Sequence, residues 1–210
     1  MILGIDVSSF QPRVDWRQLR IDGYQFASVR CCEGLVLDSM HDTHIKDALS
    51  EGFTVGSYQI GHPSQDVTAL AQFFLKHAYL EPGALKPVPD METLHNGQVP
   101  DNAGPWCDQW CELVKSATGL NSMPYASPSY YLTMCAQRPS LGGPFGWAWW
   151  CAAYKSGVGV RNLDDLKHPP AYQGKPYVAW QWCGNVSLPN QVGLWDCDVV
   201  LAESLDGVTI

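Results

Sequence analysis

The chain has 210 residues, of which 46% are hydrophobic and 16% charged, and its formal net charge is −8. This composition predicts one globular domain over residues 1–210 with a substantial core. The acidic balance argues against a nucleic-acid partner, because phosphate binding requires a basic surface, and it offers no attraction to anionic lipid. Nine tryptophans and nine tyrosines are many for this length. Such side chains fill cores and also line carbohydrate clefts.

The chain opens directly on the apolar residues of a strand. No basic segment or apolar signal core precedes it, and no apolar stretch reaches transmembrane length. We therefore expect a protein with no membrane partner. It is made in a cytoplasm, or its signal has already been removed.

The first part of the chain alternates short apolar runs with helical patterns. Strands are predicted over residues 2–6, 26–30 and 55–60, and helices over residues 16–19, 43–49 and 64–77. Asp15, Thr43 and Ser64 stand at the predicted helix starts, where side-chain oxygens cap free backbone N–H groups.

A fourth strand is predicted over residues 87–93, and it carries two acids at positions i and i+2. Because side chains alternate along a strand, Asp90 and Glu92 point the same way, about 6–7 Å apart. Carboxyl groups at such separations cleave glycosidic bonds. The alternative is a strand end that runs into a polar turn with both acids solvated.

The second part of the chain continues the alternation with weaker helices. A helix is predicted over residues 105–117, a strand over 123–126 and a short helix from Pro128. Further strands are predicted over residues 146–153, 177–182 and 195–201, and residues 155–176 are expected to form a loop. The alternation indicates a parallel sheet. We therefore predict an α/β fold, a single irregular (β/α)8-type (TIM-like) barrel with reduced helices after the fifth strand.

Eight cysteines occur in the chain, but their spacing fits neither a disulfide framework nor a zinc site. Buried free thiols are the favoured interpretation, and a disulfide between Cys183 and Cys197 stays open. No phosphate-binding glycine loop is present. We expect no metal and no cofactor.

Barrel closure would bring distant acids together, because reactive groups gather where barrel strands end. Asp6 ends the first strand, Asp90 and Glu92 end the fourth, and Asp196 and Asp198 lie on the eighth. Aromatic and amide side chains also fall near strand ends, at Tyr58, Tyr125, Tyr154 and Gln181. The alternatives are a turn-capping role for Asp6 and a polar strand-closing role for Asp198.

An ordered set of short motifs resembles one enzyme family over nearly the whole chain. The motifs are Gly4-Ile5-Asp6-Val7-Ser8 with Phe10-Gln11, Glu33-Gly34, Gly56-Ser57-Tyr58, Pro89-Asp90-Met91-Glu92, Tyr125-Ala126-Ser127, Trp150-Cys151-Ala152-Ala153-Tyr154, Trp180-Gln181-Trp182 and Asp196-Cys197-Asp198. The set is similar to that of the family 25 glycoside hydrolases, the Chalaropsis-type lysozymes. Arg30, Gln59 and His62 depart from the family pattern, but none of them replaces a matched carboxylate.

The resemblance implies a lysozyme, a retaining endo-β-1,4-N-acetylmuramidase. Such an enzyme cleaves the bond between N-acetylmuramic acid and N-acetylglucosamine in the glycan strands of peptidoglycan. Glu92 is expected to be the general acid, kept protonated beside an ionised Asp90. Asp90 is expected to be the nucleophile or the carboxylate that orients the 2-acetamido group. Asp6 and Asp196 would stabilise positive charge at the anomeric carbon. The expected substrate-binding residues are Tyr58, Tyr125, Tyr154, Gln181, Asp198 and Glu33, although Glu33 also fits a solvated loop acid.

Two other functions stay open at this point. One is a non-catalytic peptidoglycan-binding module on the same barrel, and the other is a glycosidase acting on another N-acetylated glycan. We expect a monomer. The absence of a signal and of wall-binding repeats suggests a phage endolysin, made in the host cytoplasm and released to act on the cell wall. A processed, secreted lysozyme is the other origin.

Overall fold

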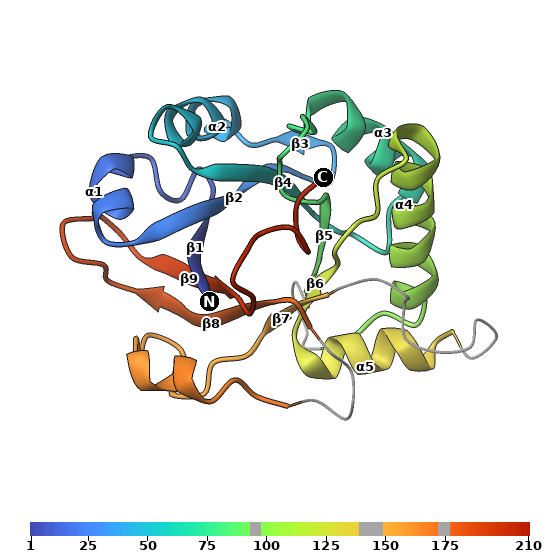
Figure 1. Cartoon of the computed structure of the whole chain (residues 1–210). Coiled ribbons are helices and arrows are strands. Elements are labelled where there is room, and N and C mark those ends of the chain that lie inside the picture. The colour runs from blue at the N-terminus through green and yellow to red at the C-terminus, as the bar shows by residue number, and fades with distance from the viewer. Residues whose placement is uncertain (93–97, 139–148, 172–176) are drawn as a thin grey trace.

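A closed ring of eight strands forms the centre of the computed structural model, which describes residues 1–92, 98–138, 149–171 and 177–210 (Figure 1). The ring strands are β1 (Ile2–Val7), β2 (Tyr24–Glu33), β4 (Thr54–Ile60), β5 (Val88–Met91), β6 (Tyr125–Ala126), β7 (Trp150–Ala152), β8 (Ala179–Val186) and β9 (Trp195–Val200). Pairing of β1 with both β2 and β9 closes the ring. A short strand β3 (Val36–Leu37) pairs with β2 outside it. The predicted irregular (β/α)8-type barrel is confirmed.

The direction of the last strand differs from the prediction of a parallel sheet. β1 to β8 pair in parallel around the ring, but β9 is antiparallel to both β8 and β1. The cause is the connection over residues 187–194, which is too short for the crossover that a parallel strand needs. The reversal places the start of β9, rather than its end, beside the ends of the other strands. Asp196 therefore lies opposite Asp6 in the β1–β9 register.

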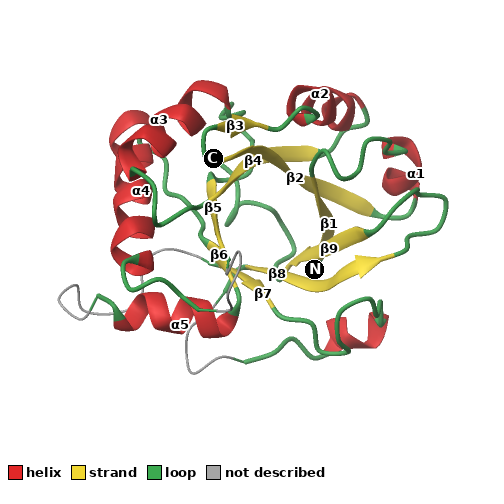
Figure 2. Cartoon of the chain, turned by 180° about the vertical axis from the view of Figure 1, so that it is seen from behind, coloured by secondary structure: helices red, strands yellow, loops and turns green. Residues whose placement is uncertain are grey.

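The helices lie outside the ring of strands (Figure 2). They are α1 (Trp16–Ile21), α2 (His41–Ser50), α3 (Val67–His77), α4 (Ala103–Thr118) and α5 (Pro128–Ala136). After α5, the described chain forms one 3₁₀ helix, Leu163–Lys167, in the segment expected to be a loop. None of the helices in the described residues has the length and hydrophobicity to cross a bilayer.

The helix starts were predicted with mixed success. The Asp15 carboxylate accepts a hydrogen bond from the Gln18 backbone N–H at 2.9 Å, so this cap is confirmed. Thr43 lies inside α2, which begins at His41. α3 begins after Asp66 rather than Ser64, because the Asp66 carboxylate caps the N–H of Thr68 at 2.8 Å.

The barrel interior is filled at one end and polar at the other. Ile2, Phe26, Met123 and Val200 pack together beneath Trp150. The C-terminal segment crosses this end of the barrel (Figure 1) and pairs with the chain before β5 through an isolated bridge. The opposite end, where β1 to β8 finish, is therefore the one left for polar side chains.

All eight cysteines are free thiols, and all except the partly exposed Cys135 are buried. Cys183 and Cys197 face each other across the β8–β9 pair. The favoured interpretation of buried thiols is confirmed, and the open disulfide is not formed in the structure.

A glycine on β4 provides a test of how tightly the barrel packs against the chain before β5. A Cβ at Gly56 would lie 2.5 Å from the Leu85 Cβ and 2.9 Å from its carbonyl oxygen. Because backbone cannot move aside cheaply, we expect Gly56→Ala to lower the free energy of unfolding by about 2 kcal/mol. Denaturant unfolding measures this, with Gly207→Ala as the control, since nothing lies within 4 Å of a Cβ there. Equal midpoints for the two variants would contradict the prediction.

Candidate active site

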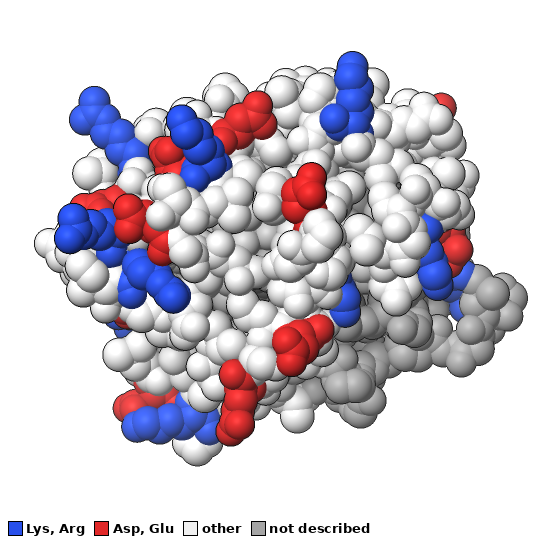
Figure 3. All heavy atoms as spheres, turned by 45° about the horizontal axis from the view of Figure 1, so that its top comes forward, with Lys and Arg blue, Asp and Glu red and all other residues white. Residues whose placement is uncertain are grey.

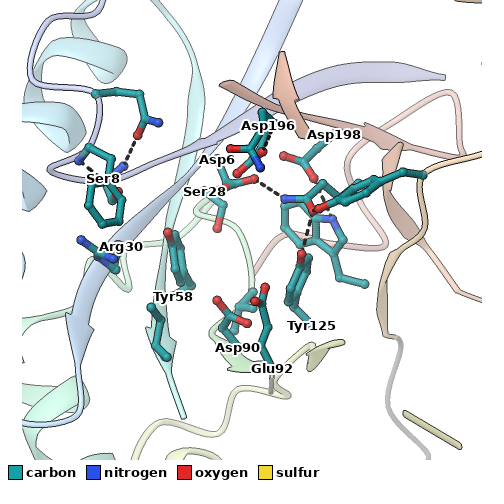
Figure 4. Close-up of a pocket in the computed structure, with 18 residues that line it drawn as sticks. Asp6, Ser8, Ser28, Arg30, Tyr58, Asp90, Glu92, Tyr125, Asp196 and Asp198 are labelled. Carbon is teal, nitrogen blue, oxygen red and sulfur yellow. Dashed lines mark hydrogen bonds between the residues drawn. The ribbon is translucent and has the colours of Figure 1, made fainter. Parts of the chain in front are cut away.

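A cleft of about 290 Å³ opens at the polar end of the barrel (Figure 4). It is lined by Asp6, Ser8, Phe10, Gln11, Ser28, Arg30, Tyr58, Ile60, Val88, Asp90, Glu92, Tyr125, Trp150, Tyr154, Gln181, Asn185, Asp196 and Asp198. All of the residues predicted for the site line this cleft except Glu33. That residue lines a neighbouring hollow.

The acids of the cleft form two groups that face each other. Asp6, Asp196 and Asp198 come from β1 and β9 and lie together on one side, whereas Asp90 and Glu92 lie side by side on the other (Figure 4). The first group forms because Asp6 and Asp196 are register partners and Asp198 is two residues further along β9. The cleft between the groups is therefore bordered by carboxyl groups on both sides.

Asp90 and Glu92 reach the cleft because of the way β5 ends. Val88 to Met91 are all buried, and Glu92 follows directly as the first exposed residue. Both acids line the cleft, as their two-residue spacing predicts. Asp90 Oδ1 is buried without a hydrogen-bond partner among the described residues. It is therefore available to a ligand in the cleft.

Burial is the largest cause of the raised pKa values of both acids in this pair, and the neighbouring charges that add to it differ. Burial raises the pKa of Asp90 well above its usual value, and the charges of Glu92 and Asp6 add to the effect. Partial burial in the cleft also raises the pKa of Glu92, against a hydrogen bond with Tyr125 that lowers it, and Asp196 raises it further. From the sequence we expected the charge of Asp90 to raise the pKa of Glu92, whereas in the structure the neighbouring charge that raises it is that of Asp196. Because repulsion between neighbouring carboxylates is mutual, the pair holds a proton to higher pH than an isolated carboxyl does.

The opposite group also favours protonated carboxyls. Burial, with the charge of Asp196, raises the pKa of Asp6 well above its usual value, although hydrogen bonds from Gln181 and Asp198 partly offset this. Burial and the charges of Asp6 and Asp196 raise the pKa of Asp198 strongly. Asp198 accepts a hydrogen bond from Trp150 Nε1 at 3.0 Å. Burial and mutual repulsion therefore disfavour negative charge on both Asp6 and Asp198.

One amide connects the two groups of acids. Gln181 Nε2 donates to Asp6 Oδ2 at 2.7 Å, and Gln181 Oε1 accepts from the Tyr125 hydroxyl at 2.7 Å and from the Tyr154 hydroxyl. Tyr125 also lies within hydrogen-bonding reach of Glu92. A tyrosine hydroxyl has one hydrogen, so Tyr125 donates either to Gln181 or to the Glu92 carboxylate, and the second bond is the one that lowers the pKa of Glu92. Gln181 thus orients Asp6 directly and shares Tyr125 with Glu92.

Charged side chains of both signs are scattered over the surface. On the face in Figure 3, acidic and basic side chains are interspersed and form no broad basic area. In the part of the chain that the structure describes, no group of three His, Cys, Asp or Glu side chains is placed to hold a metal ion.

Comparison with known proteins identifies the family. The sequence matches the family described as glycosyl hydrolases family 25 over residues 5–191. The chain belongs to glycosyl hydrolase family 25. An uncharacterized Escherichia coli protein, YegX, is 29% identical over 161 residues, which cover 73% of this chain and 56% of that protein. The chain thus spans little more than half the length of this relative.

Two further comparisons concern muramidases. An N,O-diacetylmuramidase from Arthroderma benhamiae is 24% identical over 150 residues, 67% of this chain and 64% of that protein. The solved structure of a muramidase from Trichobolus zukalii has a TM-score of 0.76 at 22% identity and covers 98% of this chain and 96% of its own. The structural likeness shows that this family 25 chain has the fold of that muramidase.

Several cleft residues of this family 25 protein escaped the sequence analysis. They are Ser8, Phe10, Gln11, Ser28, Arg30, Trp150 and Asn185. Strand alternation could have found two of them, because Ser28 is the register partner of Asp6 and Arg30 lies two residues further along β2. Ser8, Phe10 and Gln11 lie in the loop after β1, Asn185 lies near the end of β8, and Trp150 lies in a motif that was quoted only for the family resemblance.

The raised pKa values predict that stability depends on pH. A carboxyl whose pKa is higher in the folded than in the unfolded chain stabilises the fold at low pH, and this contribution is lost as pH rises through the folded pKa. We therefore expect Asp198→Asn, which keeps the acceptor for Trp150, to become more stable than the wild type as pH rises above the usual value of 3.8. The difference should reach about 1 kcal/mol near neutrality.

Calorimetry of both proteins at several pH values measures this difference. Asp101→Asn, at an exposed position, is the matched control. A wild type that stays the more stable protein at neutral pH would contradict the prediction.

Proposed function

We propose that this protein is a lysozyme (muramidase) that hydrolyses the β-1,4 bond between N-acetylmuramic acid and N-acetylglucosamine in bacterial peptidoglycan. The observation that carries the proposal is the pair Asp90 and Glu92, facing Asp6 and Asp196 across one cleft with raised pKa values. Family membership and the similarity to proteins described as muramidases support it.

Glu92 is the proposed general acid. Its carboxyl is open to the cleft, so it can reach a glycosidic oxygen, and its raised pKa keeps a proton available at higher pH than an ordinary glutamate would. Protonation of the leaving oxygen allows the bond to the anomeric carbon to break. The hydrogen bond with Tyr125 holds the carboxyl in place.

Asp90 is proposed to act on the other side of the anomeric carbon. Its unpartnered Oδ1 can attack that carbon directly, or it can accept the N–H of the 2-acetamido group and so direct the amide oxygen to attack. Either route passes through an intermediate that water then opens, and both retain the configuration. A donor from the substrate would satisfy this buried oxygen, which has no hydrogen-bond partner among the described residues.

Asp6 and Asp196 are proposed to stabilise the positive charge that develops at the anomeric carbon. They lie across the cleft from Asp90 and Glu92, so a sugar ring between the two groups meets carboxyl groups on both sides (Figure 4). Tyr58 and Tyr154 are proposed to contact the sugar from the cleft walls.

One chain supplies every residue that lines the cleft, so we propose that the enzyme acts as a monomer. Its substrate lies outside the cytoplasmic membrane. We therefore propose that it acts on the cell wall after release through a pore that another protein provides, as a phage endolysin.

The Gln181 network predicts a positioning effect. Gln181→Met keeps the length of the side chain but removes the donor to Asp6 and the acceptor for Tyr125 and Tyr154. We expect kcat to fall by about tenfold with little change in KM, because orientation of acids matters most in the transition state. Steady-state release of reducing ends measures both parameters, with Gln25→Met, an exposed position on β2, as control. A change confined to KM would mean that Gln181 binds substrate instead.

The proposed function is tested on purified peptidoglycan by identifying the new reducing ends. Muramic acid at those ends is the expected result, and glucosamine would indicate a glucosaminidase. Binding without any soluble fragment would leave a non-catalytic wall-binding module. Release of reducing ends from another N-acetylated glycan, with none from peptidoglycan, would indicate a different substrate.

A further inference from the structure

A large aromatic residue stands exposed at the wall of the cleft. Phe10 lines the cleft, yet it is 78% exposed, more than any other large hydrophobic residue that the structure describes. A phenyl ring in water forgoes the stabilisation that burial of its apolar surface would give. Single exposed apolar residues are common on protein surfaces, so the exposure of Phe10 becomes informative only together with its rigidity and its position.

The loop that carries Phe10 is fixed by its own hydrogen bonds. The Ser8 N–H donates to Gln11 Oε1 at 3.0 Å, and the Gln11 N–H donates back to the Ser8 carbonyl oxygen at 3.0 Å. The Phe10 N–H donates to Ser8 Oγ at 3.3 Å. Gln11 Nε2 also donates to the Leu194 carbonyl oxygen at 2.8 Å, which ties the loop to the connection before β9. The backbone around Phe10 is therefore ordered in advance, so a ligand that contacts the ring does not have to order the loop.

The guanidinium of Arg30 supports the Phe10 ring from one face. Its carbon lies over the ring, 5.0 Å from the ring centre. Arg30 Nε donates to Asp38 Oδ2 at 2.7 Å, and Arg30 Nη2 donates to the Ser9 hydroxyl at 3.0 Å. The Asp38 side chain is only 1% exposed and also accepts from the Ser9 N–H at 3.0 Å. Arg30, which lines both the cleft and the neighbouring hollow, is thus a fixed support for the ring rather than a free charge for a ligand.

Phe10 lies at one end of the cleft, away from the reacting acids. Its two contacts, Ser8 and Arg30, lie together at one end in Figure 4, apart from the pair Asp90 and Glu92. A sugar that reacts lies at the acids. The Phe10 ring is therefore placed to meet a sugar next to the reacting one on the same glycan strand.

We infer that Phe10 is a stacking platform for an N-acetylated sugar next to the one that reacts, an inference that rests on the proposed muramidase function. The axial C–H groups of a β-linked pyranose ring make its flat faces apolar, whereas the hydroxyl and acetamido groups project from its rim. A flat aromatic ring packs against such a face and removes it from water. Because this sugar does not change during the reaction, the contact is equal in the ground state and in the transition state. Phe10 thus binds the glycan strand without acting on the bond that breaks.

Three variants of Phe10 test the inference on soluble peptidoglycan strands from which an amidase has removed the peptides. Phe10→Ala removes the ring, Phe10→Leu keeps an apolar side chain without a flat face, and Phe10→Tyr keeps the face. We expect KM to be about fivefold higher in Phe10→Ala and Phe10→Leu with kcat unchanged, the pattern of lost uniform binding. Phe10→Tyr should keep the wild-type KM. Ile21→Ala, at a position on α1 that is 69% exposed and outside the cleft, is the matched control.

A binding measurement separates the platform from any effect on catalysis. The Glu92→Gln variant should bind the same strands without cutting them, so calorimetric titration gives its dissociation constant directly. Addition of Phe10→Ala to this variant should raise that constant by about fivefold, as it raises KM. Denaturant unfolding should give equal midpoints for Phe10→Ala and the wild type, because the exposed ring buries little surface.

Three results would overturn the inference. An unchanged KM and dissociation constant in Phe10→Ala show that no sugar meets the ring. A fall in kcat at constant KM shows that Phe10 positions the catalytic groups instead. A wild-type KM in Phe10→Leu shows that the position needs an apolar side chain but no flat face. Failure of the proposed function is a different result, because the wild type itself would then release no reducing ends from the strands.

Discussion

Glu92→Gln is expected to lower kcat on peptidoglycan by about 10³-fold, because general acid catalysis contributes on the order of 10²- to 10⁴-fold. The amide has nearly the same shape as the acid and keeps an acceptor for Tyr125, but it cannot give a proton to the leaving oxygen. Binding to the cell wall should be preserved, since the amide keeps the size of the side chain that lines the cleft. Release of reducing ends measures the activity, and sedimentation with insoluble peptidoglycan measures the binding.

A substrate with a good leaving group sharpens this test. An aryl glycoside whose phenol leaves without protonation should lose far less rate in Glu92→Gln than peptidoglycan does, because only the poor leaving group needs the acid. Glu112→Gln on α4 serves as the control for a glutamate away from the cleft. Equal losses on both substrates would show that Glu92 has another role, and an unchanged kcat would place the general acid elsewhere.

The pH dependence of wild-type activity also tests Glu92 as the general acid. Since burial and the charge of Asp196 raise the pKa of Glu92, the protonated form persists above the usual value of 4.5. Activity should therefore fall on the alkaline side as Glu92 loses its proton. Asp196→Asn removes a negative charge, lowers the pKa of Glu92 and moves that alkaline fall to lower pH.

The acids of the cleft could be found from the sequence because strand geometry is local. Alternation along β5 predicts that Asp90 and Glu92 share a face, and closure of a barrel predicts that Asp6 approaches the last strand. The direction of β9 was not predicted, since hydrophobic alternation is the same for parallel and antiparallel strands. The shortness of the connection over residues 187–194 was the available signal, and it also explains why Asp196 rather than Asp198 pairs with Asp6.

The features that the sequence did not predict depend on contacts that the local pattern does not specify. Arg30 reads in the sequence as a basic residue on a strand, and only its contacts with Asp38, Ser9 and Phe10 make it the boundary between the cleft and the hollow. Glu33 is the last residue of the same strand, where it pairs with Val36 of β3, and it lines the hollow rather than the cleft. Ser64 and Asp66 are both residue types that cap helices, and residue preferences do not decide between them. In the structure Asp66 is the N-cap of α3.

Asp90→Asn is expected to change activity and stability in opposite directions. The buried carboxyl lies close to Glu92 and Asp6, whose charges together with burial raise its pKa. Removal of the charge at neutral pH therefore relieves repulsion, and the free energy of unfolding should rise by about 1 kcal/mol. At the same time kcat should fall by about 10²- to 10³-fold, because the amide neither attacks the anomeric carbon nor accepts the N–H of an acetamido group as strongly.

Asp38→Asn is the matched control, because Asp38 is also a buried aspartate but has a lowered pKa and three hydrogen-bond donors. Its replacement breaks a buried ion pair with Arg30, so stability should fall by about 3 kcal/mol. Comparison of Asp90→Asn with Asp38→Asn distinguishes a carboxylate that is needed for catalysis from one that stabilises the fold. A buried acid that costs stability where it stands is retained because the reaction needs it, whereas an acid that holds its neighbours in place stabilises the fold. Loss of both stability and activity in Asp90→Asn would assign Asp90 to the second class and contradict its proposed role.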